Sequence, residues 1–476
     1  MSTLLPMYGR SLPLLGGVTN LVDPFRYPET DNEWQSWYDY RLDAYYGNNY
    51  SQDMVKALNL FRALDDDGDV LGVTRRLHRD IQHVVDVGAA AVSRRLVLMA
   101  GEDGEALLEQ ARPIWRRSAS QIGTWGRMLC ALGDYYIEPT RIDAQQVQMV
   151  GHDPRNVQIQ YSNDGRDQIL KAVVTYTYFD EDLEVAPDGS VISQQTPHTY
   201  QRVLTADEII ISKDGHEIER APHGLGVVPI VHLRCIALST PEHSLWSGHG
   251  IDRPLAEIDS LMSQLSAIGD RFANPKLFVK GAKVSDESKI SRFGRIINLY
   301  GGSREALSAA DARYIEPSLS GASVLLNAIN QLLADVRSSL PEFLFGGAGA
   351  NASGDALKFR SAQFESKYEE IRERFLAGLM EALAMSLSML NLETYRAEYA
   401  DRLFISAPPL LPVDRAAELS ALEAADRLGA ISAADKVRHL QRLGLVPDGV
   451  NPEDYSANLA DLSSDFASTF FNAGEE

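Results

Sequence analysis

The spacing of apolar residues predicts two helices in the middle of the chain, separated by a short insert. Across residues 250–271, apolar side chains recur every three or four positions, which is typical of a helix with one buried side. The other side of this helix carries acidic and small residues: Asp252, Asp259, Ser263, Ser266 and Asp270. The same spacing predicts a second helix over residues 321–340, with an apolar side made of Leu325, Ala328, Leu332, Val336 and Leu340.

A glycine-rich segment follows the second helix. Pro341 ends that helix, because the residue before a proline avoids the α region. Four glycines then leave the backbone few steric limits: Gly346, Gly347, Gly349 and Gly354. Ser353 and Asp355 suit the start of another helix, which runs to about residue 390. Such a long helix is expected either to cross a large assembly or to bend, and Gly378 is the expected position of a bend.

In the N-terminal half of the chain, the spacing of apolar residues changes from a helical to a strand pattern. Residues 1–30 show no period and are predicted to form an arm. Residues 31–47 are an aromatic helix, for which a core-facing role is favoured over a base-stacking platform because only Arg41 is basic. Residues 71–150 are mainly helical, with a helix ending at Gly133. Alternating and β-branched segments then predict a β-rich region over residues 135–240, so the fold class is α+β.

The C-terminal part is predicted to be separate. Residues 404–412 are rich in proline and indicate an extended linker. A helix capped by Asp414 is expected to end at Gly429. Ser432 and Asp435 resemble a capping box that opens one more helix, which ends at Gly444.

Composition limits the classes of function. The formal net charge of −21 argues against a general grip on nucleic acid but allows nucleic acid to pass without sticking. The two cysteines, Cys130 and Cys235, are interpreted as reduced core thiols. We see no signal peptide and no apolar run of membrane-spanning length, so a soluble protein of intracellular origin is expected.

Known catalytic patterns are missing from the sequence. It contains no phosphate-binding Gly-x-x-x-x-Gly-Lys-Ser/Thr loop, no Gly-x-Ser-x-Gly and no His-Glu-x-x-His. The glycines of residues 346–354 do not fit a dinucleotide fingerprint, and they follow a helix rather than a strand. Residues 65–69 are acidic but lack the spacing of a calcium loop, and the histidines are not spaced like a zinc site. We therefore expect no enzyme activity, no metal and no cofactor.

The insert between the two central helices is locally basic. Its charged residues include Lys276, Lys280, Lys283, Lys289, Arg292, Arg295 and Arg304, with few acids among them. Two interpretations remain open. These side chains form a solvated face or pair with neighbouring subunits, or they contact DNA phosphates.

The order of these segments resembles the Gp6-like portal proteins of long-tailed bacteriophages. Four local matches support the resemblance, and they lie in the expected order between residues 130 and 445. The segment Gly133-Asp134-Tyr135-Tyr136, followed by residues 152–156, resembles the start of the family's wing. Residues 224–229 resemble the stretch before the stem, residues 340–358 the tunnel loop, and residues 409–414 with 429–432 the start of the crown.

The resemblance implies a division of the chain into named parts. These are an arm (1–30), a mixed helical and β wing (31–249), a first stem helix (250–271), a small α/β clip (272–320), a second stem helix (321–340), a tunnel loop (341–354), a long wing helix (355–400) and a helical crown with the tail (401–476). The residues that would face DNA in the loop are Leu344, Phe345, Gly346, Gly347, Gly349, Asn351 and Ser353. The loop has no lysine, so contact by shape is favoured over contact by charge.

The resemblance also implies partners. A portal forms a homo-oligomeric ring, typically a dodecamer, at one capsid vertex of the virion and is assembled in the host cytoplasm. Double-stranded DNA passes through it without sequence preference, and Asp252, Asp259, Ser263 and Asp270 would line the stem channel. The implied protein partners are the terminase large subunit, a head-completion or adaptor protein, and the major capsid and scaffolding proteins; no membrane is involved. The alternatives are another virion structural protein without a DNA channel, or an enzyme with an acidic pocket.

Overall fold

A computed structural model of the chain describes residues 31–50, 76–101, 103–143, 145–164, 167–185, 191–273, 276–280, 283–284, 299–300, 311–315, 320–345, 354–411, 415–429 and 431–442. The chain forms two compact units. The larger unit comprises Met1–Ser93 and Ala100–Phe404, and the smaller one comprises Arg94–Met99 and Ile405–Glu476.

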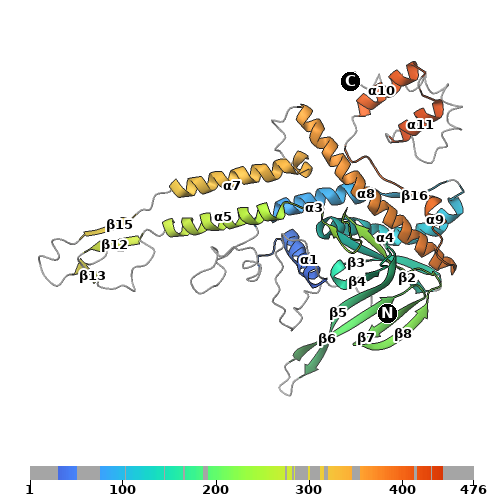
Figure 1. Cartoon of the computed structure of the whole chain (residues 1–476), viewed down its shortest axis with the longest axis horizontal. Helices are drawn as coiled ribbons and strands as arrows, with labels where there is room; N and C mark the ends of the chain where they lie inside the picture. Colours follow the sequence, from blue (N-terminus) through green and yellow to red (C-terminus); the bar gives the residue numbers. More distant parts are fainter. Residues whose placement is uncertain are drawn as a thin grey trace. The chain divides into compact units, whose positions relative to one another are not determined.

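Four helices form the core of the larger unit (Figure 1). They are α1 (Asp31–Tyr46), α3 (His78–Ser93), α4 (Glu105–Leu132) and α8 (Gly354–Asn391). Helix α3 contacts the other three, and α4 also contacts α8. Val84, Leu129 and Phe375 are fully buried between them, so these helices are held mainly by apolar packing. Five of the six aromatic residues of α1 are buried, which confirms that this helix faces the core, whereas Tyr46 at its end is exposed.

Two antiparallel sheets complete the larger unit. The first has the strand order β3-β2-β9 and contacts α8; its strands are β2 (Asp134–Asp143), β3 (Gln146–His152) and β9 (Val231–Arg234). The second has the order β4-β5-β6-β7-β8; its strands are β4 (Val157–Tyr161), β5 (Ile169–Val185), β6 (Val191–Leu204), β7 (Glu208–Lys213) and β8 (His216–Pro222). The short elements nearby are η2 (Pro154–Asn156), β10 (Ile236–Ala237), β11 (Ser244–Leu245) and α9 (Glu398–Asp401).

The two central helices lie side by side (Figure 1). They are α5 (Asp252–Ala273) and α7 (Ser320–Ser339), and they contact each other. Between them in sequence come short strands in two antiparallel pairs: β12 (Lys276–Lys280) with β15 (Asp311–Ile315), and β13 (Lys283–Val284) with β14 (Leu299–Tyr300). The 3-10 helix η4 (Pro341–Phe345) follows α7.

The smaller unit contains most of β1 (Val97–Ala100), the end of β16 (Leu403–Ser406), α10 (Arg415–Arg427) and α11 (Ala433–Arg442). The capping box at the start of α11 is confirmed. The Asp435 backbone N–H donates to the Ser432 hydroxyl over 3.1 Å, and hydrogen bonding by Ser432 lowers the pKa of the Asp435 carboxyl. Gly429 adopts a positive φ of 62° soon after α10 ends, as the sequence predicts.

Sequence and structure agree on the α+β class and on most element positions, with some differences. Strand β8 was not predicted, and β16 begins in the expected linker. Ala328 is exposed rather than part of the apolar side of α7, where Ile329, Val336 and Leu340 are buried. Helix α8 is continuous, and Gly378 leaves room for Leu233, whose Cδ2 would lie 2.2 Å from a side-chain Cβ at this position.

The two cysteines are free and fully buried, in agreement with the sequence analysis. Burial raises the pKa of the Cys235 thiol, and a hydrogen bond with Cys130 adds to this effect. The Cys235 thiol therefore stays protonated, and both cysteines are buried as core residues.

Candidate functional site

The start of α5 is fixed by a buried ion pair. Both terminal nitrogens of Arg41 in α1 donate to the Asp252 carboxylate, one of them to Oδ2 over 2.5 Å. The guanidinium lies between two indole rings, 4.3 Å from the centroid of Trp37 and 4.5 Å from that of Trp246. Trp246 Nε1 donates to Asp252 as well, over 3.2 Å. Because Arg41 and Asp252 are only 3% and 6% exposed, this contact joins α1 to α5 without screening by water.

A second buried carboxylate lies two turns further along α5. The Tyr50 hydroxyl donates to Asp259 Oδ2 over 3.1 Å, and the backbone N–H of Arg76 donates to Oδ1 over 3.2 Å. Asp259 is 2% exposed. The prediction that Asp252 and Asp259 line an open channel face is therefore wrong for this end of α5. The prediction treated the acidic side of this helix as its solvent-facing side. In the structure, Arg41 of α1, Tyr50 and the backbone of Arg76 cover that side.

The other two residues predicted for the channel face of α5 are Ser263 and Asp270. Ser263 is partly buried, and its hydroxyl donates to the Asp259 backbone carbonyl over 2.8 Å. Asp270 belongs to α5, but its side chain lies outside the described part of the structure. The exposed charges near the start of α5 are Arg253 and Glu257, one of each sign.

The segment after α7 is anchored rather than flexible at its start. Residues 341–345, predicted as part of the loop, form η4, and Glu342 and Phe343 are buried. The Glu342 carboxylate accepts hydrogen bonds from two residues of α8, the Lys367 ammonium and the Tyr368 hydroxyl, the latter over 2.6 Å. Glu342 therefore fixes the start of this segment to the interior of α8, the helix that follows residues 346–353.

Contacts with α3 hold the same region from another side. His83 Nε2 donates to the Glu342 backbone carbonyl over 3.0 Å, and its ring lies 5.0 Å from that of Phe343. Arg337 in the last turn of α7 donates to both oxygens of Asp80, each over 3.1 Å. The end of α7 and η4 are thus fixed to the helical core by polar contacts on top of the buried Val336 and Leu340.

The glycine loop itself lies outside the described residues. This applies to Gly346, Gly347, Gly349, Asn351 and Ser353, while Leu344 and Phe345 are described only as backbone of η4. In the basic insert, Lys276 pairs with Ile315 and Lys280 with Asp311 at the two ends of the β12–β15 ladder, and Lys283 pairs with Tyr300. Lys289, Arg292 and Arg295 are outside the described residues.

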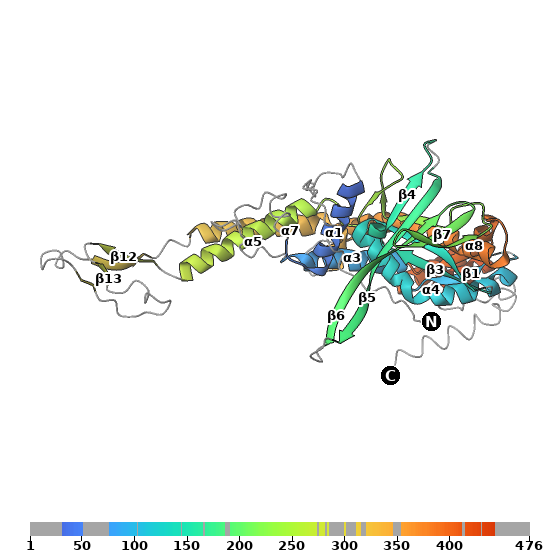
Figure 2. The same ribbon diagram turned by 90° about the horizontal axis from the view of Figure 1, so that it is seen from below.

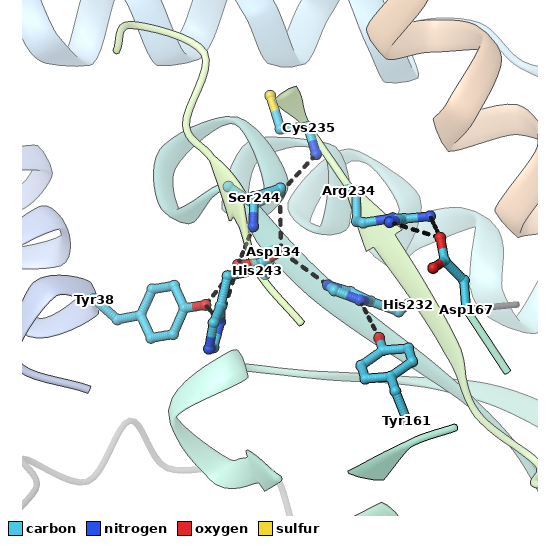
Figure 3. A network of polar contacts seen from close by, with 10 residues as sticks. Tyr38, Asp134, Tyr161, Asp167, His232, Arg234, Cys235, His243 and Ser244 are labelled. Carbon is cyan, nitrogen blue, oxygen red and sulfur yellow. Dashed lines mark hydrogen bonds and ion pairs between the residues drawn. The ribbon is translucent and has the colours of Figure 1, made fainter. Parts of the chain in front are cut away.

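A polar network around Asp134 joins β2, α1 and β9 to the segment that leads into α5 (Figure 3). Asp134 is fully buried and accepts from the Tyr38 hydroxyl of α1 over 2.5 Å, from His232 Nε2 of β9 over 2.8 Å and from the Ser244 hydroxyl over 2.8 Å. His232 Nδ1 in turn accepts from the Tyr161 hydroxyl over 2.6 Å. Burial raises the pKa of Tyr38 well above its ordinary value, with the Asp134 charge adding to the shift, so Tyr38 stays a donor.

Sequence reasoning missed this network, although it singled out the motif that begins with Gly133. Gly133 has a φ of 98°, and a Cβ there would lie 2.5 Å from the Ser244 carbonyl oxygen. The glycine is needed because residues 244–246 pass directly against the end of α4. The local signal was the Gly-Asp pair after a helix, but its partners come from distant parts of the chain.

Replacing Glu342 by alanine tests the anchor. We expect the free energy of unfolding to fall by about 2–3 kcal/mol, because Lys367 and Tyr368 lose a charged, buried acceptor. Cleavage of residues 346–353 by elastase is expected to become faster as well. The matched control is Glu370→Ala, which removes an exposed glutamate paired with Arg374 on the same helix. Equal effects of the two variants would contradict the anchor.

A second buried carboxylate on β2 gives a pH prediction. Glu138 is fully buried. Its carboxylate accepts a hydrogen bond from His152 Nε2 over 2.9 Å and forms an ion pair with Arg202. Burial, the largest influence, raises the pKa of Glu138, but the hydrogen bond from His152 and the charge of Arg202 outweigh it and lower the pKa below its ordinary value of 4.5. Ionised Glu138 therefore contributes stability above about pH 4.5, and this contribution is lost as the pH falls further.

The measurement compares urea midpoints of the natural protein and Glu138→Gln at several pH values. The difference between them is expected to be constant from pH 7 down to about 5 and to shrink below about pH 4.5. Glu398→Gln, at an exposed glutamate, is the control and should show no such trend. A difference that grows as the pH falls would contradict the prediction.

The described residues offer little that would bind a metal ion or a small molecule. Among them, no group of three or more His, Cys, Asp or Glu side chains is arranged to hold a metal ion. A groove of about 520 Å³ runs along α8 beside Ile236, but its cations are engaged, Lys367 with Glu342 and Arg374 with the Cys235 backbone carbonyl. Within the described helices, none is both long and apolar enough to cross a membrane.

The site consists of the paired central helices and the base of a loop, held by buried polar contacts to a mixed helical and β body. Comparison with protein families places it among phage portal proteins, since the model of that class matches residues 117–437, more than half of the chain. The chain belongs to this family, described as phage portal protein, SPP1 Gp6-like.

Two solved structures illustrate what else is similar. A chain from "Neck of native GTA particle computed with C12 symmetry" has a TM-score of 0.38 and 15% identity, covering 86% of this chain and 99% of that one. A chain from "Virion of native gene transfer agent (GTA) particle" has a TM-score of 0.35 and 14% identity, with the same coverage. No curated protein matches the chain. The family assignment rests on the family model.

Proposed function

We propose that copies of this chain assemble into a ring at one vertex of a phage capsid, and that the ring is the channel for DNA packaging and ejection. The observation that carries the proposal is the match of residues 117–437 to the portal family. The paired helices α5 and α7 and the anchored segment after them support it, because they supply the stem and the base of a loop that such a channel needs.

The parts of the chain take the following roles in this proposal. Residues 250–271 and 321–340 form the stem, and residues 272–320 form the clip that docks the terminase large subunit and later a head-completion or adaptor protein. Residues 401–476 form the crown toward the capsid interior, and the wing meets capsid and scaffolding proteins. The ring is a dodecamer within the virion, assembled in the host cytoplasm.

DNA contact is assigned to the loop and the clip. Leu344, Phe345 and the small residues that follow would touch DNA by shape, because the nearest basic residues are Lys358 and Arg360. An acidic stem wall cannot depend on Asp252 and Asp259, which are buried within one copy. The basic clip residues then face either DNA phosphates or the neighbouring copy.

Imaging of the purified protein by negative stain, with its mass measured by native mass spectrometry, tests the ring. A closed ring with a central hole is the expected result. A monomer at all concentrations, or a shell-like lattice, would contradict the proposal and favour another structural protein of the virion.

A further inference from the structure

The hairpin of β5 and β6 extends well beyond its sheet. Strand β4 pairs with β5 only as far as Val174, and β7 pairs with β6 only from Tyr200 onward. Farther out, among the described strands, β5 and β6 pair only with each other, from the Thr177–Thr199 pair to the Val185–Val191 pair. Figure 2 shows this ribbon leading away from the rest of the sheet. We call residues 177–185 and 191–199 the hairpin arm.

The base of the arm is braced. His198 Nδ1 lies 2.7 Å from Asp214 Oδ2, and the rings of Tyr178 and His198 are 5.5 Å apart. The outer part reaches about 30 Å at roughly 3.3 Å per residue. A two-stranded ribbon of this length is only marginally stable in water, and its open edges invite pairing with other chains. A surface that covers the arm would explain why the chain keeps it.

Charge indicates the kind of surface that fits. The arm contains four acidic residues and no lysine or arginine; the acids are Asp180, Glu181, Asp182 and Glu184. DNA would repel such a ribbon, so its partner is a basic surface.

One such surface lies on α4 of this same chain. From residue 110 to residue 132, α4 has no acid and four exposed arginines: Arg112, Arg116, Arg117 and Arg127. Arg112, Arg116, Ser120, Gly123 and Arg127 follow one line along the helix, at spacings of three or four residues, and we call this line the arginine stripe. It is about 22 Å long at 1.5 Å per residue, which is comparable with the arm.

The stripe is open to a partner. Arg112 and Arg127 are paired with Glu109 and Asp86, both exposed contacts, whereas the Arg116 guanidinium has no partner among the described residues. A Cβ on Gly123 would meet no atom within 4 Å. Small residues between the arginines thus leave a shallow path on which an extended ribbon could lie.

We propose that the hairpin arm of one copy lies along the arginine stripe of a neighbouring copy. This rests on the proposed ring, in which each copy has such a neighbour. One contact then accounts for two features that are unexplained within a single copy. DNA phosphates would also suit the stripe, but they would leave the acidic arm without a partner.

Charge reversal tests the contact. The variants Asp180→Lys/Asp182→Lys and Arg112→Glu/Arg116→Glu are each expected to raise the protein concentration needed for assembly at least about tenfold, because like charges then meet. Combining all four substitutions in one chain should restore assembly. The control, Arg427→Glu/Arg438→Glu, reverses two exposed arginines of α10 and α11 and should change nothing.

Cross-linking locates the contact. Protein carrying Asp182→Cys is mixed with protein carrying Arg116→Cys, and disulfides are formed with oxidised glutathione. The natural cysteines are fully buried, so they should not react. A mixed disulfide dimer is expected, and more of it than either variant forms alone.

Three results would overturn the proposal in distinguishable ways. If the natural protein forms rings and neither charge reversal nor cross-linking has an effect, the contact is wrong and the ring stands. If the Arg112→Glu/Arg116→Glu variant assembles normally but loses DNA binding, the stripe contacts nucleic acid instead. If the natural protein never assembles, the ring itself is wrong.

Discussion

The Arg41→Met variant is expected to lose about 3–5 kcal/mol of unfolding free energy. Removing the guanidinium leaves the Asp252 carboxylate buried without its charged partner, because Asp252 is 6% exposed. Among the described residues, the Trp246 indole N–H would remain as its hydrogen-bond donor. Unfolding in guanidinium chloride, followed by tryptophan fluorescence at one protein concentration, gives the measurement. The indole rings of Trp37 and Trp246 flank the guanidinium, so fluorescence reports on the site itself.

Two controls separate the buried charge from general damage. The double variant Arg41→Met/Asp252→Leu removes both charges and should recover more than half of the loss, because an apolar pair of similar volume avoids the desolvation cost. Arg396→Met removes an exposed partner of Glu393 and should cost about 0–1 kcal/mol. A loss below about 1 kcal/mol for Arg41→Met would show that the pair is not what holds α1 to α5.

Stiffening the glycine loop is expected to abolish DNA packaging while leaving ring assembly intact. Gly347→Pro with Gly349→Pro fixes φ near −65° at two positions that the proposed function requires to adapt to passing DNA. Assembly should persist because the loop base is held independently by Glu342, Lys367 and Tyr368. Packaged DNA protected from nuclease is the readout, with native mass spectrometry for the ring.

The matched control for the loop is Gly347→Ala with Gly349→Ala. Alanine adds volume at the same positions but keeps more backbone freedom than proline, so packaging should be reduced less. Normal packaging by the proline variant would remove the loop from the proposed function. Loss of the ring in both variants would assign these glycines to assembly instead.

Much of the architecture could be predicted from local patterns. The bounds of α1, α5, α7 and α8 and the end of α4 follow from apolar spacing and from stop signals such as Gly133 and Pro341, because a helix is specified by residues three and four positions apart. The capping box at Ser432 was also readable, since its partners are only three residues apart.

The roles of polar residues could not be predicted in the same way. Asp252 and Asp259 looked like a solvent face, but Arg41, Tyr50 and the backbone N–H of Arg76 reach them from about 180 to 211 positions away in the sequence. The loop base also differed, because Glu342 looked like part of a mobile segment until Lys367 and Tyr368 were placed beside it.

The sequence by itself determined the α+β class, the order of helices and strands, and the resemblance that the family match confirmed. These depend on local spacing and on segment order, which a single chain displays directly. Only the tertiary structure decided which acids are buried, where η4 replaces the expected loop, and that Asp134 joins β2 to α1, β9 and Ser244. Those outcomes depend on which distant side chain meets each carboxylate, because a buried charge is stable only where the fold supplies its partner.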